Sequence, residues 1–164
     1  LEYGVGTGNL TEKLLKKAEL ITGVEPSSVM RKIASTKLPS VPVLDGDFFH
    51  IPQTDQPIDT IVSTYAFHHL TDNEKEQAIA LYSSVLAPGG KIIFADTMFP
   101  SKEALLKTIH EADAVHYDRL AEDLRTEYYT TIPFLQSVLE KHHFRATFQQ
   151  LNPFVWLMEA VKQS

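Results

Sequence analysis

The chain has 164 residues, of which 43% are hydrophobic and 22% are charged, and its formal net charge is −6. This length predicts one domain with a core of its own, and no apolar run approaches the length of a membrane span. The absence of cysteine excludes disulfides and thiolate metal sites and suits a cytoplasmic protein. Because lysine and arginine are outnumbered by acids and scattered, a nucleic-acid partner is not expected.

The first eleven residues predict a ligand-binding turn between a strand and a helix. Glu2 is followed by glycines at alternate positions, Gly4, Gly6 and Gly8, and then by the apolar periodicity of a helix. Glycine reaches backbone angles closed to other residues and leaves room for a ligand. The free N–H groups at the start of the helix favour an anionic or electron-rich group. We therefore expect Glu2 and the three glycines at the nucleotide crevice of a doubly wound sheet.

The glycine spacing separates two classes of nucleotide site. A dinucleotide-binding turn reads G-x-G-x-x-G, which, counted from Gly4 and Gly6, places its third glycine at Asn9. The third glycine is Gly8 instead, so the pattern disfavours an NAD-dependent oxidoreductase. A glycine-rich turn without a ligand is the alternative interpretation.

The chain begins inside this first strand, without an initiator methionine and three residues before the glycine turn. A strand of a doubly wound sheet is expected to have more residues upstream. The sequence therefore predicts a single domain over residues 1–164 whose N-terminal segment is missing.

The second element pair carries a candidate ribose ligand. Residues 10–18 predict an amphipathic helix, residues 19–25 predict a short strand, and Ser27 or Ser28 caps a helix that ends near residue 37. Glu25 lies at the carboxyl end of that strand, where a carboxylate can accept hydrogen bonds from both hydroxyls of a ribose. A surface or helix-capping glutamate is the alternative.

The third and fourth strands are predicted at residues 41–44 and 58–64. Asp45, Asp47 and Phe48 follow the third strand, and a plain turn aspartate is the competing interpretation of either acid. The fourth strand is rich in β-branched residues, as a strand covered on both faces requires. Its carboxyl end includes Ser63.

Tyr65, His68 and His69 follow the fourth strand and are expected to point into the crevice. Imidazole titrates near neutral pH, so either histidine is a candidate general base or a group that orients a substrate. A packing role at a helix start is the alternative. Adjacent histidines are expected to face different directions, so no metal site is predicted.

The remaining elements follow the same alternation. Residues 72–86 predict a capped helix, a Pro-Gly-Gly turn at residues 88–90 follows, and residues 91–96 predict the fifth strand. Asp96 at its end either reaches the substrate or caps the next helix. The further helices and strands are predicted at residues 102–112, 114–125, 133–142, 145–151 and 154–160.

In their order and spacing, these motifs resemble those of the class I S-adenosylmethionine (SAM) dependent methyltransferases. The resemblance covers essentially the whole chain and is carried by Glu2 to Gly8, Glu25, Asp47-Phe48, residues 58–64 and the turn at 88–90. The most similar group is one of small bacterial methyltransferases whose acceptor is uncharacterised. The resemblance implies an α/β fold with a Rossmann-like, doubly wound, mostly parallel seven-stranded sheet and an antiparallel C-terminal hairpin strand.

The resemblance also implies SAM as the cofactor and assigns its contacts. The glycine turn wraps its methionine and ribose portions, Asp47 and Phe48 hold the adenine, and Ser63 lies beside the cofactor. Residues 101–131 form a substrate-side insertion. In it, Tyr128 and Tyr129 either line the acceptor pocket or pack against the missing N-terminal helices.

The implied reaction is direct in-line methyl transfer, for which positioning is the main requirement. The candidate catalytic residues are Tyr65, His68, His69 and Asp96, and a base is needed only for an acceptor protonated at neutral pH. The Asn/Asp-Pro-Pro-Tyr/Phe signature of enzymes that methylate amino groups is absent after the fourth strand, which favours a small-molecule acceptor over DNA. Transfer RNA and protein acceptors stay open. A SAM-binding regulatory protein without turnover is the alternative function, and the oligomeric state is not predicted.

Overall fold

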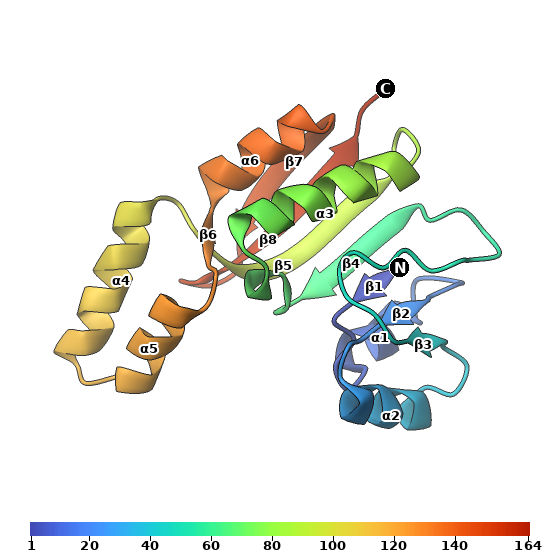
Figure 1. The fold of residues 1–164 in the computed structure, drawn as a ribbon, viewed down its shortest axis with the longest axis horizontal. Coiled ribbons are helices and arrows are strands. Elements are labelled where there is room, and N and C mark those ends of the chain that lie inside the picture. Colours follow the sequence, from blue (N-terminus) through green and yellow to red (C-terminus); the bar gives the residue numbers. More distant parts are fainter.

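A single sheet organises the chain, and the computed structural model describes it over residues 1–164 (Figure 1). The strand order is β3-β2-β1-β4-β5-β8-β7. Neighbouring strands from β3 to β5 are parallel, whereas β8 runs antiparallel to both β5 and β7. The predicted seven-stranded, mostly parallel sheet with an antiparallel C-terminal strand is confirmed. The strands are β1 (Glu2–Tyr3), β2 (Gly23–Val24), β3 (Val43–Leu44), β4 (Thr60–Thr64), β5 (Lys91–Phe99), β7 (Phe144–Gln150) and β8 (Val155–Lys162), and β6 (Thr130–Thr131) pairs only with the end of β5.

The helices lie on the sheet except for one pair. In Figure 1, α3 and α6 lie side by side over the half of the sheet formed by β5, β8 and β7, and α4 and α5 lie beyond the end of β5. None of them is both long and apolar enough to cross a bilayer. The helices are α1 (Asn9–Leu14), α2 (Ser28–Lys37), α3 (Asp72–Val85), α4 (Lys102–Ala114), α5 (Asp118–Thr126) and α6 (Ile132–Lys141), with a short 3-10 helix η1 (Phe67–His69) after β4.

Local sequence explains where these helices begin. The Ser27 hydroxyl accepts a hydrogen bond from the Met30 backbone at the start of α2. Thr71 and Glu74 form a reciprocal capping box at the start of α3. Such caps satisfy backbone donors that have no partner inside the helix.

An aromatic cluster fixes the segment after β3 against the sheet. The rings of Tyr3 and Phe48 lie 5.3 Å apart, and those of Phe67 and Phe94 lie 4.9 Å apart. The Tyr82 hydroxyl, on α3, donates to the Phe48 carbonyl at 2.9 Å. Aromatic pairs at these separations stabilise by about 0.5–1.5 kcal/mol beyond their buried area. The cluster therefore holds residues 47 and 48 at the carboxyl edge of the sheet.

The fifth strand differs from its prediction. We expected it to end at Asp96, but β5 continues to Phe99 and extends past the last residue of β4. Asp96 is therefore inside a strand, and Ser101 caps the following helix in its place. The extra residues of β5 pair with β6 and β8, partners that lie far away in the sequence.

A buried lysine connects α3 to the insertion at residues 101–131. The Lys75 side chain is 1% exposed, and its ammonium donates to the carbonyls of Leu70 and Tyr128. The Tyr128 N–H in turn donates to the His68 carbonyl at 3.1 Å. Burial lowers the pKa of Lys75 to about 8, against the raising effect of nearby acids.

The substitution Lys75→Met should destabilise the fold by about 1–3 kcal/mol at pH 7, because it leaves two carbonyls without their donor. Between pH 8 and 10, the unfolded chain binds a proton at Lys75 that the folded chain has lost. Wild-type stability relative to the variant should therefore rise over this range. Urea unfolding of the wild type and the variant at pH 8 and at pH 10 measures this difference in stability. Lys107→Met, at an exposed lysine of α4, is the matched control, and superimposed wild-type and Lys75→Met curves would contradict the prediction.

Candidate nucleotide and acceptor site

A cavity of about 900 Å³ opens where the carboxyl ends of the first four strands meet. Its wall is built from the turns that follow β1, β2, β3 and β4, and its volume suits a small-molecule or cofactor site. The predicted site residues on this wall are Gly4, Gly6, Glu25, Asp47, Phe48, Tyr65 and His69.

The glycine turn needs its glycines for two different reasons. Gly4 has φ +66°, and a Cβ there would lie 2.6 Å from the Ala66 Cβ. Gly6 has φ +57° and no atom within 4 Å of a Cβ position, so it borders open space. Both angles disfavour an L side chain. The turn can therefore pass close to β4 and still leave room for a ligand.

Glu25 is buried on the cavity wall, with 5% of its surface exposed. One carboxylate oxygen accepts the Gly6 N–H and the other accepts the Ser27 N–H, both at 2.8 Å. Because the side chain is buried, the interpretation of Glu25 as a surface residue is wrong. The hydrogen bond from the Ser27 N–H, at the start of α2, is consistent in part with the helix-capping interpretation. Each oxygen keeps a lone pair free, so the carboxylate can also accept ligand hydroxyls.

The structure separates the two aspartates that follow β3. Asp47 lies on the cavity wall and accepts the Phe49 N–H at 2.8 Å. The Asp45 side chain is 74% exposed and pairs with Arg31 at 2.8 Å. Only Asp47 can therefore contact a ligand in the cavity.

Three predicted residues lie behind the turn and not on the wall: Glu2, Gly8 and Ser63. Burial raises the pKa of the Glu2 carboxyl, and its Oε2 has no hydrogen-bond partner. A Cβ on Gly8 would lie 2.8 Å from Leu38, so Gly8 serves helix packing. The Ser63 hydroxyl is buried without a partner beneath Gly4. The structure gives these residues a place that supports the turn and no direct access to the cavity.

Sequence reasoning missed part of the wall. Thr64 borders the cavity although its neighbour Ser63 does not, because successive side chains of a strand point to opposite faces. On α1, Leu10 and Lys13 reach the wall at helical spacing, a signal that the sequence did contain. The other unpredicted wall residues include Thr7, Asn9, Ser27, Met30 and Leu70.

Tyr65 adopts a strained backbone directly after β4. Its φ is +53°, a left-handed conformation that is uncommon for a residue with a bulky side chain. Its side chain is exposed on the cavity wall, as predicted. Backbone strain of this kind gathers at ligand sites.

Asp96 holds His68 beside the cavity. The buried Asp96 carboxylate lies 2.7 Å from His68 Nδ1 and accepts the His68 N–H at 3.0 Å and the Thr97 N–H at 2.7 Å. A carboxylate only accepts, so Nδ1 carries the proton and Nε2 is left free. Burial lowers the pKa of His68, but the hydrogen bond and charge of Asp96 outweigh it, so the pKa is raised.

The two adjacent histidines face the same side, contrary to the prediction. Their ring centroids are 4.3 Å apart, because both belong to the tight turn η1. His69 lies on the cavity wall, and its Nδ1 is 3.1 Å from the Glu127 carboxylate. Sequence reasoning missed Glu127, which comes from the insertion.

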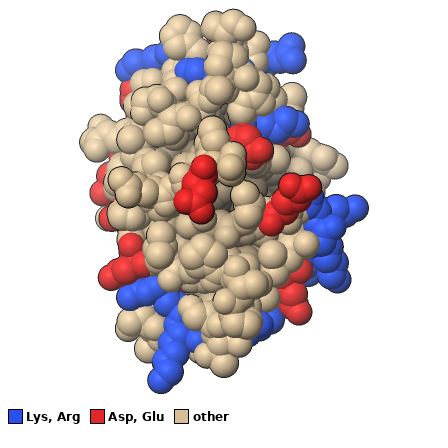
Figure 2. All heavy atoms as spheres, turned by 90° about the vertical axis from the view of Figure 1, so that its right-hand side faces the viewer, with Lys and Arg blue, Asp and Glu red and all other residues tan.

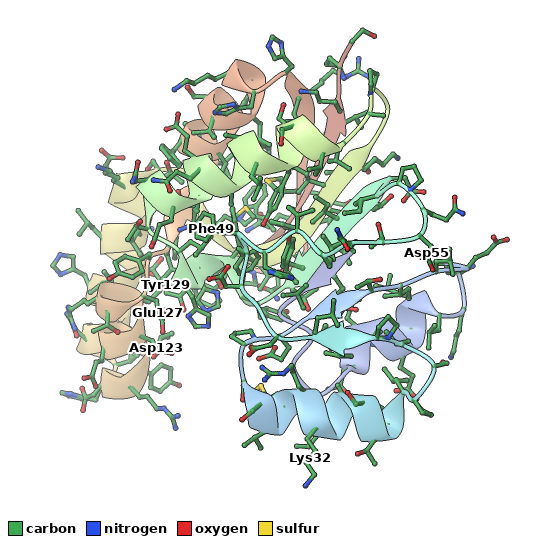
Figure 3. The ribbon with its side chains drawn as sticks, turned by 45° about the vertical axis from the view of Figure 1, so that its right-hand side comes forward. Lys32, Phe49, Asp55, Asp123, Glu127 and Tyr129 are labelled. Carbon is green, nitrogen blue, oxygen red and sulfur yellow. The ribbon has the colours of Figure 1, made fainter.

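The tyrosines of the insertion do not line the cavity. The Tyr129 ring packs 5.3 Å from the His68 ring, and Tyr128 contributes backbone contacts. Figure 3 shows Glu127 and Tyr129 just after α5, at the end of the helix pair that lies next to the body of the fold. The insertion therefore approaches the histidines from outside the cavity.

The surface in Figure 2 carries acidic and basic side chains interspersed, without a large patch of one charge. A protein that binds a nucleic-acid backbone gathers its cations on one face. The side chains on this face do not form a single basic patch of that kind.

Residues 1–90 match the family model for a methyltransferase domain. An uncharacterized methyltransferase of Geobacillus kaustophilus is 58% identical over 165 residues, which cover 100% of this chain and 77% of that relative. An uncharacterized methyltransferase of Anoxybacillus flavithermus is 56% identical over 163 residues, which cover 99% of this chain and 77% of that relative.

Solved structures share the fold at low identity. The protein YcgJ of Bacillus subtilis has a TM-score of 0.78 at 16% identity, over 99% of this chain and 91% of that chain. A SAM-bound amino pentose methyltransferase of Micromonospora echinaspora has a TM-score of 0.74 at 15% identity, over 99% of this chain and 82% of that chain. The family-model match over more than half of the chain and the identity to the curated relatives show that the chain belongs to the methyltransferase family.

Proposed function

We propose that the chain binds SAM in the cavity and transfers its methyl group to a small-molecule acceptor by direct in-line displacement. The observation that carries this proposal is the buried Glu25 carboxylate, which faces the cavity between the glycine turn and Asp47. Bound SAM supplies a methyl group already activated by a positively charged sulfur.

The residues on the wall fit the ribose and the adenine of SAM. Glu25 has the free lone pairs to accept the two ribose hydroxyls, and Gly6 leaves open space beside it. Asp47 offers a carboxylate to the adenine amino group, and Phe48 offers an apolar edge beside it. Glu2, Gly4, Gly8 and Ser63 hold the turn in place.

The acceptor enters, in this proposal, beside Tyr65 and the histidines. The exposed aromatic face of Tyr65 can attract the positively charged sulfur of SAM by about 0.5–2 kcal/mol. His69 reaches the cavity directly and orients the acceptor, and Asp96 acts through His68 as a positioning residue. Holding reactants in line supplies at most about 7–11 kcal/mol of the barrier, so positioning can carry most of the catalysis.

Two observations support a small molecule as the acceptor. The charges on the face in Figure 2 are interspersed, and the segment after β4 lacks the signature of enzymes that methylate amino groups. Two structural neighbours are described as methyltransferases of an amino pentose and of magnesium protoporphyrin IX. Regulation through SAM binding without turnover is the alternative that the experiments below separate.

The variant Glu25→Ala should weaken SAM binding about tenfold or more, because charge-assisted hydrogen bonds contribute about 1.5–3 kcal/mol each. Calorimetric titration of SAM into the folded variant measures this. Asp45→Ala removes an acid from the next strand end without touching the cavity and should leave the affinity unchanged. Equal SAM affinity of wild type and Glu25→Ala would reject the proposed ribose contact. Competition of NAD with SAM for the wild-type protein would reject the assignment of SAM as the specific cofactor.

The variant His69→Ala should lower turnover more than SAM affinity, because His69 lies on the acceptor side of the wall. Labelled SAM incubated with a panel of hydroxyl, amine, thiol and carbon acceptors identifies the reaction to be measured. His110→Ala, at an exposed histidine of α4, is the control. Unchanged turnover in His69→Ala would reduce this residue to scaffold, and SAM binding without turnover on any acceptor would favour the regulatory alternative.

A further inference from the structure

Three potential metal ligands converge at the rim of the cavity: His68, His69 and Glu127. One ligand atom from each lies within 4.8 Å of the others. The three come from two segments that are distant in the sequence, η1 and the residue after α5. Their side chains are 15%, 61% and 32% exposed, respectively, so the cluster is open to solvent on one side.

The separation of the first pair suits a shared ion. His69 Nδ1 and Glu127 Oε2 lie 3.1 Å apart. Metal–nitrogen and metal–oxygen bonds of about 2.0–2.2 Å place two neighbouring ligands about 3.0–3.5 Å apart. The same distance also fits a hydrogen bond between the two side chains, so the pair alone does not decide.

The third ligand is already oriented. The Asp96 carboxylate holds His68 Nδ1 at 2.7 Å, which leaves Nε2 as the free nitrogen. Metal-binding histidines are commonly held in this way by a carboxylate on the second ring nitrogen. The ring centroids of His68 and His69 lie 4.3 Å apart, and the His69 side chain is 61% exposed, so its ring is not held in place by surrounding atoms on all sides.

The local charge also permits a cation. The carboxylates of Asp96 and Glu127 outnumber the single ammonium of Lys75 that acts on His68. Two imidazoles and one carboxylate suit Zn²⁺, Fe²⁺, Co²⁺ or Mn²⁺ better than Ca²⁺ or Mg²⁺, which prefer oxygen ligands.

We propose that His68, His69 and Glu127 form a binding site for a divalent transition-metal ion at the rim of the cavity. The three residues leave further coordination positions open toward solvent. An ion there can hold an acceptor through an oxygen, nitrogen or sulfur atom next to the wall residue His69. This use of the ion rests on the proposed methyl transfer, whereas the binding of the ion does not.

The test is a titration of Co²⁺ into the full chain, purified without a histidine tag and in the absence of SAM. The wild type should bind one Co²⁺ per chain and develop visible absorption bands, and Zn²⁺ should displace it. Asp96→Asn should weaken the binding about tenfold or more through the loss of an oriented His68. Glu127→Gln and His69→Gln, which alter exposed or half-exposed side chains, should weaken it at least as much.

His110→Gln is the matched control, because His110 is an exposed histidine outside the cluster. It should bind Co²⁺ like the wild type. Circular dichroism confirms that each variant is folded. Wild-type affinity in Glu127→Gln and His69→Gln, or equal weakening in His110→Gln, would overturn the metal site and leave a hydrogen-bonded pair. Since no SAM is present, this result is independent of the outcome of the SAM titration.

Discussion

The buried carboxylate of Glu25 is the constraint on which the cavity depends. A buried carboxylate needs hydrogen-bond donors, and Glu25 takes them from Gly6 and Ser27, which belong to two different turns. This fixes the glycine turn relative to the start of α2. Gly6 donates this N–H from a backbone with φ +57°, which glycine adopts without strain. The local choices of residue and the parallel arrangement of β1 and β2 therefore produce one site.

Asp96 is a second buried carboxylate of this kind, and it orients the His68 ring. It is 2% exposed and receives two backbone N–H groups together with the His68 ring. Because β5 extends past the last residue of β4, Asp96 lies beyond the end of β4, where its carboxylate contacts η1. Two buried acids at the carboxyl edge of one sheet thus fix the turns around them, and both have hydrogen-bond partners because backbone N–H groups donate to them.

The sequence predicted what depends on local pattern. Glu25 and the glycine turn follow from their places at strand ends, whereas Asp47 is preferred to Asp45 only through the resemblance to the methyltransferase motifs. The order of helices and strands follows from hydrophobic periodicity. The sequence could not predict which side chains of a strand face the cavity, and Thr64 borders it in place of the predicted Ser63. Glu127 lies 58 residues from His69, and only tertiary docking brings the two together.

The insertion packs on a hydrophobic cluster separate from the main core. Its buried residues Ile109 and Leu124 form a small cluster with Phe99 of β5, apart from the main core of 19 residues. Its polar contacts with the rest of the fold include the side-chain hydrogen bonds of Lys75 and Glu127, the Tyr128 N–H that donates to the His68 carbonyl, and the pairing of β6 with β5. A region with a small core of its own opens at lower free energy than the main core does. We therefore expect α4 and α5 to open at a lower free energy than the strands that carry the turn around Glu25.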